Sequence, residues 1–438
     1  MQNKAKLRKS QMNVNSGLSK DYEKKTLSER GKNKPKTNPK QTQTKPKQSQ
    51  TNPIKAKTNR RSRGDPIFSP KTHANFLPWP TTSTIPILPP TNYEQRTMSN
   101  KQILITGGCG FLGQYLTSDL LSAFPDTQIT ILDLKANPAA FFDFSDNPRV
   151  TIHLGRDICD YDSIVAHFKN IDTVIHLAGL VSFSLLDKNP LHKINVDGTA
   201  NVLNAARANK VESFIHISSV AALGYADDKN NPINETFDFD WSIAEKNKKY
   251  YMLTKHLADV EVSKYQNAGQ NAVVLYPGLM FGPGDVTNSA KLIKAIKQGK
   301  IPFNMPGGTN ITDVRDVSKG IVQTLKKDVT HGHYLLSGYN LTFKQINTTI
   351  AEALRAKPPR PTLPRFLNTP LFKLLLFIES RSKTKLQLPA DNLDSAFKFR
   401  YFDNAKARAE LDWQPEITFE QTIIDTIKWM EENGHFER

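Results

Sequence analysis

A tyrosine and a lysine lie four residues apart in the segment "YYMLTK", at Tyr251 and Lys255. On a helix this spacing directs both side chains to one face. A phenol with a pKa of about 10 is a poor base at neutral pH, but a nearby ammonium favours the phenolate by Coulomb attraction. The pair could therefore take or give a proton at a substrate oxygen. Taken alone, it also fits an ordinary amphipathic surface.

Two serines end an apolar run in "HISSVAALG", at Ser218 and Ser219. Residues 211–219 predict a strand, and ligands bind at the carboxyl ends of the strands in open parallel sheets. A serine hydroxyl there could hydrogen-bond the substrate oxygen and orient it. The same pair after a strand is also common turn chemistry.

Glycines crowd the stretch "ITGGCGFLGQYL", residues 105–116, at Gly107, Gly108, Gly110 and Gly113. The stretch joins a predicted strand to a predicted helix. There the glycines leave room for a pyrophosphate against the helix N-terminus, where free N–H groups and the helix dipole favour negative charge. The pattern predicts a dinucleotide-binding turn, or, on the weaker reading, only a tight turn.

Asp133 ends the next predicted strand, 20 residues after Gly113. A carboxylate there can accept both ribose hydroxyls of an adenosine and would repel a 2′-phosphate, so it favours NAD over NADP. Lys135 nearby keeps NADP as the alternative, and Asp133 could also be a plain strand-end turn residue. With a nicotinamide cofactor, Tyr251 would exchange a proton with the oxygen of the carbonyl or alcohol whose carbon gains or loses the hydride.

The elements that would position these residues alternate between strands and helices from residue 101 onward. This alternation predicts a Rossmann-type doubly wound parallel sheet with right-handed crossovers. Apolar runs predict strands at 102–107, 128–134, 149–158, 172–180, 211–219 and 271–278, and helical spacing predicts helices at 111–124, 197–210 and 250–269.

The regular alternation of strands and helices ends at about residue 280. The sequence after it predicts a smaller, mostly helical substrate lobe. Residues 288–300 and 417–434 have helical patterns, and residues 312–327 predict a strand or turn followed by a helix. The apolar segment 366–378 predicts a lobe helix that faces the core or the substrate, with a place at a membrane interface as the alternative. We therefore divide the chain into a tail at 1–97, a cofactor-binding domain with the catalytic residues at 98–280, and a lobe with returning elements at 281–438.

The positive charge of the chain is concentrated in its first quarter. Residues 1–100 hold 21 Lys and Arg against 5 Asp and Glu, out of 59 and 42 in all 438 residues, which leaves 38 and 37 for the rest. With few apolar side chains, residues 1–97 predict a disordered basic tail. Its charge allows loose contact with anionic lipid or nucleic acid, without specific nucleic-acid recognition. Met98 is a candidate natural start.

Several classes of protein are disfavoured. No signal peptide is recognisable, and no apolar stretch is long enough to span a membrane. Two cysteines, Cys109 and Cys159, are too few for a disulfide framework and favour a cytoplasmic location. We predict no metal site, because His331 and His333 fall in an expected loop without a partner cluster.

Together these motifs resemble the extended short-chain dehydrogenase/reductase superfamily over about residues 100–438. "TGGCGFLG" is similar to its Thr-Gly-x-x-Gly-x-x-Gly motif, "RDI" to the pair beside adenine, and "HLAG" and "INVDGTANVLNAA" to segments near the cofactor. The resemblance implies catalytic roles for Tyr251, Lys255 and Ser219, with Ser218 the alternative if the register shifts by one. It implies cofactor binding by Gly107, Gly110, Phe111, Leu112, Gly113, Asp133, Asp157, Ile158, Ala178, Gly179, Asn195, Lys255 and Pro277.

Within the superfamily, "LYPGLMFGPGD" at 275–285 and the region of Trp241 look most like the branch of 3β-hydroxysteroid dehydrogenase/isomerases and dihydroflavonol reductases. Tyr276 departs from the arginine usual in that branch. The resemblance implies an NAD-dependent oxidoreductase for a secondary alcohol or carbonyl of an apolar, steroid-like or flavonoid-like substrate. The alternatives are a nucleotide-sugar 4-epimerase or dehydratase with tightly held NAD and, less favoured, a non-catalytic dinucleotide-binding regulator. The superfamily also suggests a homodimer.

Overall fold

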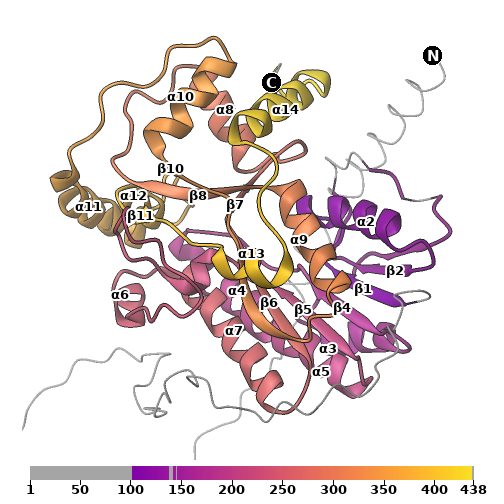
Figure 1. The fold of residues 1–438 in the computed structure, drawn as a ribbon. Coiled ribbons are helices and arrows are strands. Elements are labelled where there is room, and N and C mark those ends of the chain that lie inside the picture. The colour runs from indigo at the N-terminus through magenta and orange to yellow at the C-terminus, as the bar shows by residue number, and fades with distance from the viewer. Residues whose placement is uncertain (1–100, 138–141, 145, 437–438) are drawn as a thin grey trace, which may run out of the picture. The chain divides into compact units, whose positions relative to one another are not determined.

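The computed structural model describes residues 101–137, 142–144 and 146–436 (Figure 1). The predicted disordered tail at 1–97 and the candidate start at Met98 lie outside these residues. In the part that is described, no helix is both long and apolar enough to cross a bilayer.

Seven parallel strands form the central sheet, which confirms the predicted doubly wound fold. The chain reverses direction across the sheet between β1 and β4, and such a switch point is where ligands bind in this architecture. In sheet order the strands are β3 (Val150–His153), β2 (Gln128–Leu132), β1 (Gln102–Thr106), β4 (Thr173–His176), β5 (Ser213–Ile217), β6 (Ala272–Pro277) and β9 (His331–Leu336).

Helices pack on both faces of this sheet and create two apolar cores (Figure 1). Successive strand residues point to opposite faces, so Ile103 and Ile105 enter one core and Leu104 the other, all with no exposed surface. The first core is covered by α2 (Phe111–Ala123), α9 (Val314–Lys326) and α13 (Ala405–Leu411), and the second by α3 (Tyr161–Ile164), the 3-10 helix η1 (Val165–Phe168), α5 (Gly198–Ala208) and α7 (Tyr250–Asn267).

A second, smaller sheet lies among the late elements, where the sequence predicted mostly helices. Strand β8 pairs with β7 and β11 in parallel and with β10 antiparallel. Strands β7, β10 and β11 are short, and the six-residue β8, GTNITD, has only one large apolar residue, which explains why the sequence did not reveal them. They are β7 (Leu279–Phe281), β8 (Gly308–Asp313), β10 (Tyr339–Thr342) and β11 (Phe399–Arg400), and a third core joins part of them to α8 (Ser289–Lys297), α10 (Phe343–Ala353) and α14 (Phe419–Glu432).

Short elements complete the connections between these layers. They are η2 (Leu185–Asp187), α4 (Lys188–His192), the π-helix η3 (Lys193–Asp197), η4 (Val220–Leu223), α6 (Trp241–Lys246), η5 (Arg365–Leu367), α11 (Asn368–Arg381) and α12 (Ala390–Ala396). Since α9, β9 and α13 return to the central sheet, the late part of the chain contributes to both layers. The division at residue 280 stays a prediction.

Two local expectations were wrong. His331 and His333 belong to strand β9, which pairs with β6, rather than to a loop. His333 Nδ1 hydrogen-bonds the hydroxyl of Tyr276 at 2.7 Å. The segment 366–378 does form a helix, α11, but Leu374 and Phe377 are exposed instead of facing a core.

Candidate active site

The glycine-rich turn brings the ends of β1 and β4 into close approach. Gly107 has a positive φ of 72°, which favours glycine, and its N–H donates to the carbonyl oxygen of Leu132 at 2.8 Å. A Cβ on Gly107 would lie 2.8 Å from the Cα of Ala178. The turn therefore needs glycine here for both its conformation and its space.

Helix α2 begins directly after this turn, and its first residues are Phe111 and Leu112. Gly110 is the N-cap and makes no side-chain cap hydrogen bond. A Cβ on Gly113 would collide with the carbonyl oxygen of Gly108, so the helix can pack this closely only with glycine. An uncapped, glycine-lined helix N-terminus fits the pyrophosphate of a dinucleotide.

Asp133 lies beside the turn, immediately after β2. Its Oδ2 accepts a hydrogen bond from the backbone N–H of Cys109 at 3.0 Å. Burial and the Asp133 charge raise the pKa of the Cys109 thiol to about 11, so the thiol is protonated at neutral pH. The carboxylate is placed where a ribose next to the turn would meet it.

Asp157 and Ile158 follow β3 at the same edge of the sheet. Asp157 Oδ1 accepts from the N–H of Cys159 at 2.9 Å, and Ile158 is buried. Gly198 begins α5 directly beneath, since a Cβ on it would lie 2.7 Å from Cδ1 of Ile158. Contact of Asp157 and Ile158 with an adenine ring stays a prediction.

Asn195 ties the segment after β4 to the helix that carries Tyr251. It lies in the π-helix η3, an element found often at functional sites. Its Oδ1 accepts from the N–H of Leu180 at 2.7 Å, and its Nδ2 donates to the carbonyl of Leu180 at 3.0 Å and to Thr254 Oγ1 at 3.2 Å. Ala178 and Gly179 directly precede Leu180, so the hydrogen bonds from Asn195 to the Leu180 backbone also hold the backbone of these two residues in place.

The side chains of Ser219 and Tyr251 lie near each other and interact. Ser219 follows β5 and also caps η4, where its Oγ accepts from the N–H of Ala221 at 3.2 Å. Burial raises the pKa of Tyr251, while the interaction with Ser219 and the charge of Arg400 act to lower it. Ser219 and Tyr251 are therefore candidates to contact the same substrate oxygen.

Lys255 lies one turn beyond Tyr251 on α7, and its Nζ donates to the carbonyl of Ile217 at 3.2 Å. Burial lowers the pKa of Lys255 to about 8, against the opposing charge of Asp259. Because burial dominates at Tyr251, its pKa is raised overall. The lowering of the Tyr251 pKa by Lys255 stays a prediction.

Ser218 points away from this group. Its Oγ donates to Asp259 Oδ1 at 2.6 Å, and both side chains are buried. Of the two adjacent serines, Ser219 is thus the one that contacts Tyr251. Pro277 ends β6 opposite Leu336 of β9, two strands of the same sheet.

Sequence reasoning missed two charged residues near the site. Asp259 lies four residues after Lys255, and this one-turn spacing could have revealed it. Arg400, whose charge reaches Tyr251, comes from β11 nearly 150 residues later. No local pattern could have placed Arg400 there.

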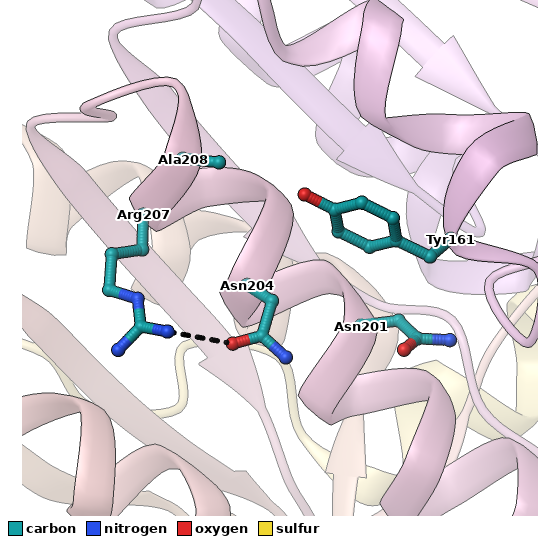
Figure 2. Close-up of a pocket in the computed structure, with 5 residues that line it drawn as sticks. All are labelled: Tyr161, Asn201, Asn204, Arg207 and Ala208. Carbon is teal, nitrogen blue, oxygen red and sulfur yellow. Dashed lines mark hydrogen bonds between the residues drawn. The ribbon is translucent and has the colours of Figure 1, made fainter.

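A separate hollow of about 590 Å³ lies between α3 and α5 (Figure 2). Arg207 Nη2 donates to Asn204 Oδ1 at 3.4 Å on its rim. It is lined by Tyr161, Asn201, Asn204, Arg207 and Ala208. None of these residues belongs to the predicted site, so we define the site by the side chains gathered at the switch point.

Comparison with known sequences adds two relatives that align over most of their own length. A protein of Synechocystis sp., provisionally named a dihydroflavonol 4-reductase, is 27% identical over 341 residues, which cover 76% of this chain and 95% of the relative. The sterol-4-alpha-carboxylate 3-dehydrogenase (decarboxylating) of Bos taurus is 25% identical and covers 75% and 92%.

Solved structures share the fold. A dTDP-glucose 4,6-dehydratase from Streptomyces venezuelae with NAD bound has a TM-score of 0.61 at 20% identity, covering 76% of this chain and 98% of that one. The family model for the NAD dependent epimerase/dehydratase family matches residues 103–337, from the start of β1 to the end of β9. This match spans more than half of the chain and contains every predicted site residue, so the chain belongs to the NAD-dependent epimerase/dehydratase family.

Proposed function

We propose that this protein is an NAD-dependent oxidoreductase that acts on a secondary alcohol or carbonyl of an apolar, steroid-like or flavonoid-like substrate. One arrangement carries the proposal: the Ser219 and Tyr251 side chains lie near each other and interact, with Lys255 one helical turn away from Tyr251. These are the groups needed to hold one oxygen atom and to exchange a proton with it.

The cofactor would lie across the switch point between β1 and β4. Bound NAD supplies the acceptor or donor of the hydride. The turn from Gly107 to Gly113 would hold its pyrophosphate, Asp133 a ribose, and Asp157 with Ile158 the adenine. The glycines let the turn pack closely against the backbone of Ala178 and Gly108, and this packing shapes the turn proposed to hold the pyrophosphate.

The chain's own residues would carry the proton chemistry. The Ser219 hydroxyl would donate to the substrate oxygen and orient it, and the Tyr251 phenol would take the alcohol proton or return it to the carbonyl oxygen. Lys255 would hold the nicotinamide ribose through its ammonium. A protonated Lys255 would also favour the phenolate of Tyr251 electrostatically.

Apolar substrates are favoured by the relatives and by the surroundings of Tyr251. The relatives are named for a sterol and a dihydroflavonol, both ring systems with a reacting oxygen. The Phe183 ring lies 5.4 Å from the Tyr251 ring in an edge-on contact, which gives the site an aromatic wall.

A nucleotide-sugar 4-epimerase or dehydratase is the second candidate. A dTDP-glucose 4,6-dehydratase of Neisseria gonorrhoeae is 25% identical and covers 77% of this chain and 98% of the relative. Such an enzyme would return the hydride to the same substrate, so reduced cofactor would not accumulate.

A cofactor and substrate screen on the full chain separates these functions. NAD and NADP would each be tested with 3β-hydroxysteroids, dihydroflavonols, and UDP- and dTDP-sugars, and the reduced nicotinamide and the products would be measured. We expect net reduced NAD with an apolar alcohol. A rearranged sugar without net reduction would favour the second candidate, and no turnover in any arm would contradict both.

A further inference from the structure

Helix α11 presents large apolar side chains to solvent. Leu374, Phe377 and Ile378 have i, i+3 and i+4 spacing, so they lie on one face, and they are 58%, 55% and 45% exposed. Phe366, in the preceding η5, is 76% exposed. Exposed apolar residues gathered in this way indicate an interaction surface.

The opposite side of α11 is anchored. Glu379 is buried, and its Oε1 accepts from the N–H of Leu185 at 3.0 Å while its Oε2 accepts from the N–H of Ala390 at 2.9 Å. Figure 1 shows α11 at the edge of the described elements, with α12 on its inner side. The apolar face is therefore held outward by contacts on the other face.

Most of the charged residues around this face are positive, and Arg365 and Lys385 are paired with Asp227 and Asp187. Residues 365–388 contain five basic residues and one acidic residue, Glu379, which is buried. The guanidinium of Arg381 lies 3.6 Å from the centre of the Phe377 ring. The basic residues are Arg365, Lys373, Arg381, Lys383 and Lys385. Since residues 101–438 as a whole are nearly neutral, this is a local excess.

A connecting segment leads from α11 to the candidate active site. Leu185 and Asp187 contact the end of the helix region through Glu379 and Lys385, and Val181 and Leu186 of the same segment are exposed. Phe183, between them in sequence, contacts Tyr251. Residues 181–187 therefore connect the exposed apolar face of α11 with Tyr251.

We propose that this face docks on the surface of an anionic lipid membrane. The lipid-docking surface consists of Val181, Leu186, Phe366, Leu374, Phe377 and Ile378, with the surrounding lysines and arginines. Apolar side chains would enter the region between headgroups and acyl chains, while the long basic side chains reach the anionic headgroups. The basic residues at 1–100 would add electrostatic attraction to the same kind of surface.

Charge argues for lipid over a second copy of the chain. In a twofold symmetric contact the same patch meets itself, so Lys373, Arg381 and Lys383 would be brought close to the same positive charges of the second copy. An anionic membrane complements these charges. The consequence for the substrate rests on the proposed function: an apolar substrate would reach Tyr251 from the bilayer, past the segment at 181–187.

Vesicle flotation of the full chain tests the proposal, with phosphatidylcholine vesicles that contain or lack phosphatidylserine. We expect binding to the anionic vesicles and a loss of about tenfold or more in the double variant Leu374→Asp/Phe377→Asp. The control is Ile424→Asp on α14, because Ile424 is 51% exposed and lies outside the surface. The comparison is repeated at high salt, which screens the attraction of the basic N-terminal segment.

Three results would overturn the proposal. They are failure of the wild-type chain to bind anionic vesicles, equal binding by the double variant, and self-association in solution that the double variant abolishes without any vesicle binding. NAD affinity is measured in parallel. Unchanged NAD affinity in the double variant keeps the lipid result independent of the proposed function.

Discussion

The Ser219 side chain interacts with the phenol of Tyr251, while the hydroxyl of the neighbouring Ser218 donates a hydrogen bond to Asp259. The backbone after β5 therefore sends two consecutive hydroxyls in different directions. One reaches the phenol on α7, and the other reaches a buried carboxyl one turn beyond Lys255. This division gives each serine a distinct expected role.

Replacing the two serines separately should give different losses. Ser219→Ala should lower kcat by about a hundredfold, because a positioned hydroxyl is removed from the substrate oxygen. Ser218→Ala should leave kcat nearly unchanged but lower the free energy of unfolding by about 1–3 kcal/mol, because buried Asp259 loses a hydrogen bond. Initial rates and denaturant unfolding measure both. Equal loss of kcat in the two variants would contradict the different roles expected for Ser219 and Ser218.

Gly107→Ala should abolish NAD binding at concentrations that saturate the wild type. Gly155→Ala is a matched control, because both glycines have a φ of 72° but only Gly107 would place its Cβ against Ala178. Both variants should lose about 1 kcal/mol of stability from the backbone conformation. Cofactor titration by fluorescence distinguishes them, and similar NAD affinities in the two would argue against a pyrophosphate at this turn.

Asp133→Asn should shift cofactor preference toward NADP. The amide keeps an oxygen acceptor but removes the negative charge that would repel a 2′-phosphate, so the ratio of kcat/KM for NAD to that for NADP should fall by about tenfold or more. Asp126→Asn, at an exposed position on a loop after α2, controls for net charge. An unchanged ratio in Asp133→Asn would show that Asp133 does not face the ribose.

NAD binding should weaken as the pH rises through about 8. Burial lowers the pKa of Lys255 to about 8, so the ammonium that would hold the nicotinamide ribose is present below that pH and is lost above it. The kcat/KM for NAD reports ionisation of the free enzyme and should decline above pH 8. Lys255→Met should lower this value at every pH and remove that decline. Persistence of the same decline in Lys255→Met would assign it to another group.

The central sheet could be predicted because its signals are local. Buried parallel strands such as β1 appear in the sequence as short apolar runs. The glycines at 107–113 mark the turn between the end of β1 and the beginning of α2. Tyr251 and Lys255 could be paired because they share one helix. The choice of Ser219 over Ser218 rested on the resemblance, since the sequence alone could not say which hydroxyl turns inward.

The later elements could not be predicted because they depend on distant partners. β11 has two residues and exists only because it pairs with β8, about 90 residues earlier. The sequence around His331 and His333 is typical of a loop, yet β9 forms there because it pairs with β6. Apolarity alone did not reveal the outward face of α11, which is set by the contacts of buried Glu379.

Formation of reduced NAD by Tyr251→Phe, compared with wild type and Tyr250→Phe, tests the central claim most directly. Tyr250 is the matched control because it is the adjacent tyrosine on the same helix. With the alcohol identified in the screen, Tyr251→Phe should bind NAD normally but lose about 10²–10⁴-fold in kcat, while Tyr250→Phe keeps most activity. Full activity in Tyr251→Phe would contradict the assignment of the phenol as the proton-transfer group.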